Sequence, residues 1–193
     1  MYVKLKWLLF FIPITILATN CKHNEWKNLE HEIRTTTITV PTDSFEVLKP
    51  ERQTQAYLQA IDSPNLRYVV YIDSLQCASC RMHKMNIWRS IMQYTHTVGA
   101  RVDFCFIFRP KNKSVAEFRH EYYAQKIQMR FFLDTTGVME RHNPLLAKSS
   151  IFHAFVLNDS NHIEVIGDAS KSELVERKYY EFLHKKKAER NAP

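Results

Sequence analysis

The chain has 193 residues and a formal net charge of +7, and hydrophobic residues make up 45% of it. This suits one globular domain with an extension, and the scattered basic residues lack the stripe with interleaved aromatics that nucleic-acid binders often show. The three glycines are Gly99, Gly137 and Gly167, from which neither a G-x-x-x-x-G-K-[ST] phosphate loop nor a G-x-G-x-x-G dinucleotide motif can be built. ATPases and Rossmann-type dehydrogenases are therefore excluded. An H-E-x-x-H motif and a paired C-x-x-C zinc framework are absent from the sequence as well.

The first 20 residues have the features of an export signal. Two lysines precede an uncharged apolar run over residues 7–18, which is shorter than the roughly 20 residues of a membrane-spanning helix. Cys21 follows shortly after, and this arrangement resembles bacterial lipoprotein signals of the Bacteroidetes type, with Ala18 and Asn20 departing from the usual box. The resemblance implies that Cys21 is lipidated and becomes the mature N-terminus. An ordinary cleaved signal with a spare cysteine is the alternative.

Four segments are expected on this basis. They are a lipoprotein signal peptide (residues 1–20), a tether or N-terminal extension (21–44), a folded domain (45–185) and a basic C-terminal tail (186–193). Acyl chains on Cys21 would hold the protein at a membrane surface of the bacterial cell envelope, facing the periplasm. Whether this is the inner or the outer membrane stays open.

Hydrophobic periodicity predicts alternating strands and helices along the domain. The predicted strands cover residues 35–40, 66–72, 102–108, 129–133, 151–157 and 162–166. The predicted helices cover residues 51–62 and 80–98, a segment starting at Ser114 with Glu117 at capping-box spacing, and a segment from Ser170 to about His184. The last two strands form a hairpin. This order implies an α/β fold with a mixed central sheet and helices on both faces.

Two of the four cysteines form a C-x-x-C motif, Cys77-Ala78-Ser79-Cys80, between a predicted strand and a long predicted helix. A helix N-terminus offers unpaired N–H groups and the positive end of the helix dipole, which favour a thiolate. Two intervening residues let the sulfurs close a disulfide within one turn. We therefore expect a redox pair with Cys77 as nucleophile and Cys80 as resolving thiol. An inert structural disulfide is the alternative, although so short a loop stabilises little.

The residues beside the motif offer other chemistry. Met82, His83 and Met85 would be soft metal ligands, but methionines at helical spacing are more often core residues, so no metal ligand is predicted. Cys105 lies within a predicted strand among aromatic residues and is expected to be a buried small hydrophobe rather than a third redox thiol.

These features resemble the thioredoxin superfamily, in particular its exported, membrane-tethered TlpA/redoxin branch, which includes the reductases of cytochrome c maturation. The residues that carry the resemblance are 69–73, 77–81, Trp88, 134–137 and 155–158. Residues 114–133 match the helix and strand inserted in that branch. The resemblance covers about residues 45–185. It implies a thioredoxin-like fold with an N-terminal extension, disulfide exchange with protein substrates, an upstream membrane redox donor and no cofactor.

Three positions depart from the branch. Gln76 replaces the aromatic residue that usually precedes the first cysteine, and no proline stands near Phe152, where the branch has a cis-proline that faces the disulfide. His83 stands where the maturation reductases carry a glutamate. A carboxylate repels a thiolate and an imidazole does not, so His83 is a candidate modulator that keeps the thiols more acidic than a glutamate would. A solvent-facing histidine without influence is the alternative.

The sequence thus predicts a lipid-anchored thiol–disulfide oxidoreductase of the cell envelope, with Cys77 and Cys80 as catalytic residues. Membrane contact through the lipid anchor and no nucleic-acid partner are expected. The missing proline motivates the alternative of a non-enzymatic thioredoxin-fold binding or metal-handling module. Ser74-Leu75-Gln76-Cys77 resembles the T-x-x-C motif of peroxiredoxins, but Val70 stands where that family has a proline, so a peroxidase is only a minor alternative.

Overall fold

The computed structural model describes residues 31–32, 35–50, 65–110 and 114–191. The chain divides into two compact units, Met1–Thr36 and Thr37–Pro193. Within the described part, no helix is both long and apolar enough to cross a membrane. The predicted signal peptide, its Cys21 and the predicted helix over 51–62 lie outside the described residues.

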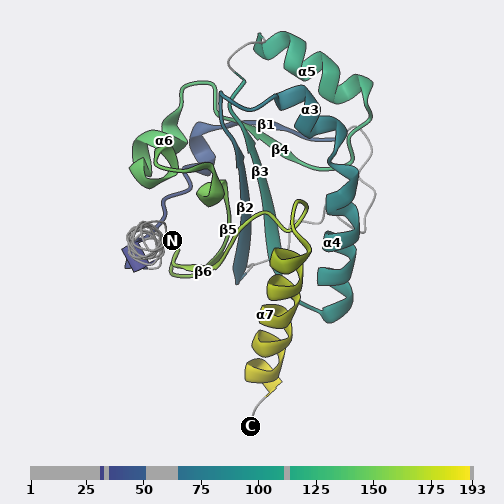
Figure 1. Cartoon of the computed structure of the whole chain (residues 1–193). Coiled ribbons are helices and arrows are strands. Elements are labelled where there is room, and N and C mark those ends of the chain that lie inside the picture. The colour runs from purple at the N-terminus through teal and green to yellow at the C-terminus, as the bar shows by residue number, and fades with distance from the viewer. Residues whose placement is uncertain (1–30, 33–34, 51–64, 111–113, 192–193) are drawn as a thin grey trace, which may run out of the picture. The chain divides into compact units, whose positions relative to one another are not determined.

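The second unit is built on a six-stranded mixed sheet with the strand order β1-β4-β3-β2-β5-β6 (Figure 1). Its strands are β1 (Glu46–Leu48), β2 (Leu66–Ile72), β3 (Val102–Phe108), β4 (Phe131–Leu133), β5 (Ala154–Asn158) and β6 (Ile163–Ile166). Strands β2, β3 and β4 run parallel, whereas β1 pairs antiparallel with β4 and the β5–β6 hairpin joins β2 antiparallel. A β-α-β unit, an inserted helix and strand, and a closing β-β-α unit make this a thioredoxin-like fold, which confirms the predicted fold class.

Helices cover both faces of the sheet (Figure 1). They are α3 (Ala78–His83), α4 (Asn86–Val98), α5 (Val115–Ala124), α6 (Val138–His142) and α7 (Glu173–Asn191), and short 3-10 turns occupy Thr42–Ser44 (η1), Pro144–Ala147 (η2) and Ser150–His153 (η3). Successive side chains of a strand point to opposite faces. The Tyr68 ring accordingly meets Trp88 of α4 and Tyr179 of α7, whereas Tyr71 meets Glu140 of α6 on the other face.

An aromatic core fixes the helix that carries the motif. Trp88 is 1% exposed, and its ring lies edge-on to Tyr68 at 4.9 Å and to Phe106 at 5.2 Å between centroids. The Tyr68 hydroxyl donates to the carbonyl of Gly167 and accepts from the backbone N–H of Ala169. Burial of such rings is a large favourable term, and buried hydroxyls need partners. Through Tyr68 the core therefore joins α4, the helix that follows the motif, to the loop between β6 and α7.

The long helix predicted over 80–98 is wrong in one respect, because the structure divides it into α3 and α4. The backbone N–H groups of Lys84 and Met85 bond to the carbonyls of Arg81 and Met82, three residues back, which tightens the helix into a 3-10 turn. Met85 is 2% exposed and packs into the core. The sequence has neither glycine nor proline here, so the break could not be read from the pattern.

The strand predicted over 35–40 is also wrong. Thr37 makes an isolated bridge to His162, and Thr39 instead pairs with the side-chain amide of Asn143, donating to its Oδ1 at 2.9 Å and accepting from its Nδ2 at 2.7 Å. The edge strands of the sheet are β1 and β6. The β-branched run forms no ladder, because its backbone bonds to the Asn143 side chain and, at Ile38, to the carbonyl of Asn161.

Helix α7 begins and ends later in the chain than predicted. Ser172, and not Ser170, stands at the start of the helix, where its Oγ accepts from the N–H of Val175 at 3.4 Å. The Ser170 hydroxyl donates to Asp168 instead. The helix continues past His184 to Asn191, so the lysine run is helical. At α5 the predicted capping box of Ser114 and Glu117 is confirmed.

Candidate active site

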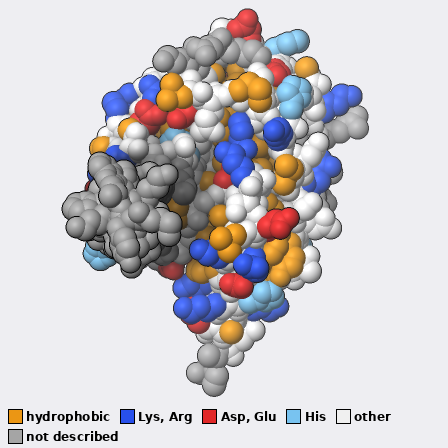
Figure 2. Space-filling model, viewed as in Figure 1, with side chains coloured by type: hydrophobic (Ala, Val, Ile, Leu, Met, Phe, Trp, Pro, Cys, Tyr) orange, Lys and Arg blue, Asp and Glu red, His pale blue; other side chains and the backbone are white. Residues whose placement is uncertain are grey.

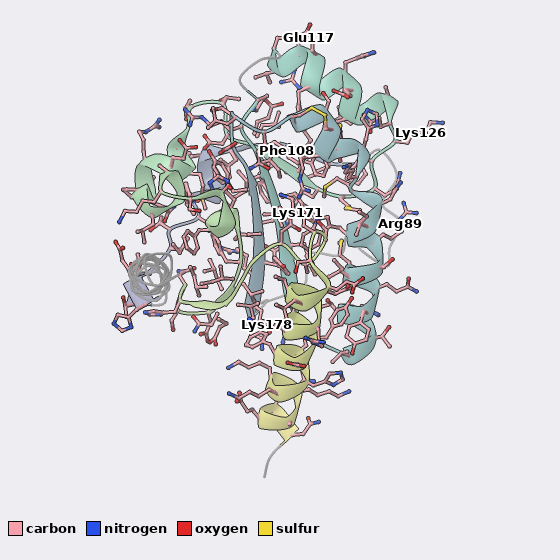
Figure 3. The ribbon with its side chains drawn as sticks, in the orientation of Figure 1. Arg89, Phe108, Glu117, Lys126, Lys171 and Lys178 are labelled. Atoms are coloured by element: carbon pink, nitrogen blue, oxygen red, sulfur yellow. A yellow bond between two sulfur atoms is a disulfide. The ribbon has the colours of Figure 1, made fainter. Side chains whose placement is uncertain are left out.

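The two cysteines of the motif form a disulfide at the start of α3, with their Cα atoms 5.2 Å apart (Figure 3). Cys77 is the N-cap of this helix, and its Sγ accepts a hydrogen bond from the backbone N–H of Cys80 at 3.2 Å. Both residues are exposed. The pair is thus open to an attacking thiolate, and the Cys80 N–H lies where it stabilises a thiolate on Cys77 after reduction.

A turn held by Asp73 leads from β2 to the motif. The buried Asp73 follows the last residue of the strand, and its Oδ1 accepts from the backbone N–H groups of Leu75 at 2.9 Å and Gln76 at 3.0 Å. A carboxylate that bonds to backbone two and three residues on stabilises a turn in this way. Leu75 is 84% exposed at the tip. The turn leads the chain from the carboxyl end of β2 to Cys77 at the start of α3.

His153, at the end of η3 and just before β5, is the buried histidine of this site. Its Nε2 lies 2.7 Å from the carbonyl oxygen of Leu146 and must donate to it, so in the neutral ring Nδ1 is the acceptor. Nδ1 faces the Nε2 of Gln76 at 3.2 Å and the Oδ2 of Asp73 at 3.6 Å. The histidine therefore connects the segment before β5 to the residue that precedes Cys77.

The resemblance to the TlpA/redoxin branch predicts a proline in the segment before β5. Phe152 is buried, His153 follows it, and no peptide bond of the described residues is cis. In this segment the chain has an imidazole that is hydrogen-bonded to Gln76.

A carboxylate also lies beside the motif, contributed by α5. The Ser79 hydroxyl, between the two cysteines, donates to Glu121 Oε2 at 2.8 Å. Glu121 Oε1 accepts from Gln125 at 3.1 Å and lies 3.6 Å from His83 Nε2. The His83 side chain is 64% exposed, whereas that of Glu121 is 18% exposed. His83 thus lies against α5, and a helix about 40 residues further along the chain contributes an acidic group to the motif.

An ion pair ties α3 to the loop between β6 and α7. The Nη2 of Arg81 lies 2.6 Å from Asp168 Oδ2, and both side chains are largely buried. Asp168 also accepts from the backbone N–H of Ser170 at 3.0 Å and lies 3.5 Å from Lys171 Nζ. A buried, charge-assisted bond of this kind fixes geometry. It holds the residue after Cys80 against the loop.

A cleft of about 430 Å³ opens at these residues. Its lining comprises Val70, Tyr71, Gln76, Arg81, Ser149, Ser150, His153, Ala154, Gly167, Asp168, Lys171, Ser172 and Val175. Gln76 directly precedes the motif and Arg81 directly follows it, so the cleft reaches both ends of the disulfide segment. Most of the lining side chains are polar.

Cys105 lies apart from this site and is 0% exposed on β3. Its Sγ lies 3.4 Å from Asp103 Oδ2, and burial together with this carboxylate raises the pKa of the Cys105 thiol. The prediction of a buried small hydrophobe is confirmed. No group of three or more His, Cys, Asp and Glu side chains that could hold a metal occurs in the described part of the chain.

Sequence reasoning identified the cysteines, His83 and the segment that ends in Asp73, but it did not place Glu121, His153 or Asp168 at the motif. These three residues come from α5, from η3 and from the loop between β6 and α7, and no spacing in the sequence connects them to the motif. One signal was available, since the expected proline near Phe152 pointed to the segment that holds His153.

No family model and no curated protein matches this chain. Solved structures resemble it at low identity. A thioredoxin-like protein studied in its oxidized form shares 10% identity, with 72% of this chain and 93% of that one covered at a TM-score of 0.43. A thioredoxin-like protein from Bacteroides caccae shares 9%, with 86% and 55% covered at 0.45, so this chain spans about half of its length. StoA from Bacillus subtilis shares 13%, with 69% and 96% covered at 0.41.

At these values the neighbours carry no weight for what this chain does. The sheet order, the crossover helices and the disulfide at the start of α3 define the class by themselves: a thioredoxin-fold protein with a C-x-x-C disulfide.

Proposed function

We propose that this protein is a thiol–disulfide oxidoreductase that acts on protein disulfides through Cys77 and Cys80. The observation that carries the proposal is the exposed Cys77–Cys80 disulfide at the start of α3, with Cys77 Sγ accepting the Cys80 N–H. An exposed cysteine pair at a helix start favours thiolate formation, and accessible disulfides are the labile ones.

In the reducing direction, the Cys77 thiolate attacks one sulfur of a substrate disulfide. The substrate S–S bond breaks, a mixed disulfide with Cys77 forms, and the first substrate thiolate leaves and takes a proton. The Cys80 thiolate then attacks Cys77 Sγ, which forms Cys77–Cys80 and releases the second substrate thiol. Two electrons pass from the protein dithiol to the substrate, and the reduction potentials of the two partners decide the direction.

The groups around the disulfide support these steps. The turn at Asp73 presents Cys77, and His153 with Gln76 fixes the segment ahead of it. No organic cofactor takes part in the exchange. A membrane electron donor would regenerate the dithiol in an oxidising compartment.

The export features of residues 1–20 belong to the same proposal. They support lipidation of Cys21 and a location at the periplasmic side of a cell-envelope membrane. Incorporation of labelled fatty acid into the wild type, and its absence from Cys21→Ala, tests this part; equal labelling of the two would refute it.

A redox titration coupled to a disulfide-reductase assay tests the catalytic part. The expected result is a reversible two-electron Cys77–Cys80 couple together with turnover of a protein disulfide. A protein that reduces no disulfide substrate, but binds stoichiometric copper or zinc when its cysteines are reduced, would contradict the enzyme and support the metal-handling alternative.

A further inference from the structure

The cleft beside the disulfide is lined by more cationic than anionic side chains. Among the described residues that line it, Arg81 and Lys171 are cations and Asp168 is the acid, which leaves a surplus of one positive charge before His153 is considered. Over the face shown in Figure 2, in contrast, Lys and Arg are interspersed with Asp and Glu. The surplus in the cleft lies at Arg81 and Lys171, which both contact Asp168.

Arg81 keeps hydrogen-bond donors that Asp168 does not use. Its Nη2 donates to Asp168, whereas its buried Nε has no hydrogen-bond partner among the described residues. A guanidinium carries five N–H donors in a planar fork that matches carboxylates. The Nε N–H is enclosed by protein, so a carboxylate that enters the cleft would meet the remaining N–H groups of the guanidinium.

Lys171 supplies the second cation from the rim. Its Nζ lies 3.5 Å from Asp168 Oδ2, and its side chain is 53% exposed. Figure 3 labels it in the loop between β6 and α7. Because Asp168 is shared between two cations, neither is neutralised fully, and a second carboxylate would find both within the same cleft.

The size and position of the cleft fit a peptide segment. About 430 Å³ lies within the range of roughly 300–1,000 Å³ of ligand sites. Gln76 and Arg81 bracket the cysteine pair, so residues that flank a substrate cysteine would reach the cleft while their sulfur reaches Cys77. His153 and Gln76 offer further polar contacts there.

We propose that the cleft lined by Arg81, Lys171 and Asp168 binds an acidic side chain beside the substrate cysteine, so that the protein prefers disulfides with acidic flanks. This rests on the proposed function, since it concerns the substrate of the same disulfide. The preference comes from charge complementarity at a partly exposed site, which is worth a few-fold in rate and weakens with added salt.

The test uses three short disulfide-bonded peptides that differ only in carrying Glu, Gln or Lys beside each cysteine. The reduced full-length protein is mixed with each, and second-order rate constants are read from quenched alkylation. Each constant is divided by that for dithiothreitol with the same peptide, which removes intrinsic differences in leaving-group reactivity. The expected order is Glu above Gln above Lys, with about threefold to fivefold between Glu and Gln at low salt.

Two variants with the same change in net charge complete the test. Lys171→Gln should lose most of the preference for the Glu peptide, whereas Lys178→Gln, on α7 and outside the cleft lining, should retain it. Exchange with all three peptides at equal normalised rates, or equal loss in both variants, would overturn the inference and leave the proposed function intact. Absence of exchange with every peptide would overturn the proposed function, and this inference with it.

Discussion

The hydroxyl of Ser79 donates to Glu121 across 2.8 Å, so a carboxylate from α5 is hydrogen-bonded to a residue that stands between the two cysteines. Glu121 also lies 3.6 Å from His83. A carboxylate near a thiolate disfavours the charged form of the sulfur. We therefore expect α5, which is remote in sequence, to influence the reactivity of the motif.

Glu121→Gln should make the active-site thiols more acidic. The amide keeps an acceptor for Ser79 but removes the negative charge, so the thiolate fraction at neutral pH rises. We expect alkylation of the reduced protein at about pH 7 to be about twofold to fivefold faster than in the wild type. Glu181→Gln, on the exposed side of α7, is the charge-matched control. Equal rates in all three proteins would show that Glu121 has no electrostatic effect on the motif.

His83→Glu should act in the opposite direction. A glutamate at this position adds a second carboxylate on the face of α3 that meets Glu121, 3.6 Å from the present imidazole nitrogen. Like charges this close disfavour a nearby thiolate, so alkylation should slow and its pH profile should move upward. His83→Ala is the matched control. Superimposable profiles for the wild type and both variants would establish that His83 is a solvent-facing residue without influence.

The cysteine roles can be separated by trapping. Cys80→Ser leaves the Cys77 thiolate able to attack but removes the resolving thiol, so mixed disulfides with substrates should accumulate. Cys77→Ser should abolish exchange. Non-reducing electrophoresis of each reduced variant with a disulfide substrate measures both outcomes. Both cysteines are exposed, so either could be the attacking thiol. Accumulation of mixed disulfides in Cys77→Ser instead would make Cys80 the nucleophile and Cys77 the resolving thiol.

Local spacing explains why much of the fold was predictable. The capping box of Ser114 and Glu117 and the apolar run of β2 depend on residues close in sequence, and both are confirmed. Glu121 and His153 could not be placed at the motif, because their approach depends on how α5 and η3 pack against the sheet. The split between α3 and α4 could not be predicted either, because Met82 and Met85, which are both buried, would also share one face of an unbroken helix.

High pH should destabilise the protein. Burial raises the pKa of Tyr68, Tyr122 and Tyr179 above the ordinary 10.0, and that of Cys105 above 9.0. These groups keep their protons in the folded state while the unfolded chain loses them. Their contribution to the free energy of unfolding is therefore complete below the ordinary pKa values. It declines as pH rises above those values, by at most about 1.4 kcal/mol per group and pH unit.

Urea unfolding between about pH 8 and pH 11 measures this decline. Tyrosinate absorbance should appear together with unfolding rather than before it. Tyr179→Phe should make the decline shallower, although it loses the contact of 2.9 Å with Thr95, and Tyr123→Phe, at an exposed position, is the control. A free energy of unfolding that does not change across this range would contradict the prediction.

Gly167, which lines the cleft, should tolerate no side chain. Its φ is +120°, and a Cβ would lie 2.8 Å from Val175 Cγ2. Gly99, at the end of α4, has a φ of +77° but open space, with Arg190 Nη2 at 4.0 Å as its nearest neighbour. Gly99→Ala should therefore cost only the left-handed backbone strain, about 1 kcal/mol, whereas Gly167→Ala should cost about 2–4 kcal/mol.

A double-mutant cycle separates strain from crowding at Gly167. Val175→Ala removes the two methyl groups that a Cβ would meet, so it should recover part of the stability lost in Gly167→Ala, with a coupling of about 1 kcal/mol or more. Urea midpoints of the four proteins give this coupling. Additive effects of the two substitutions would mean that the loss comes from the backbone alone, and equal losses in Gly99→Ala and Gly167→Ala would refute the steric argument altogether.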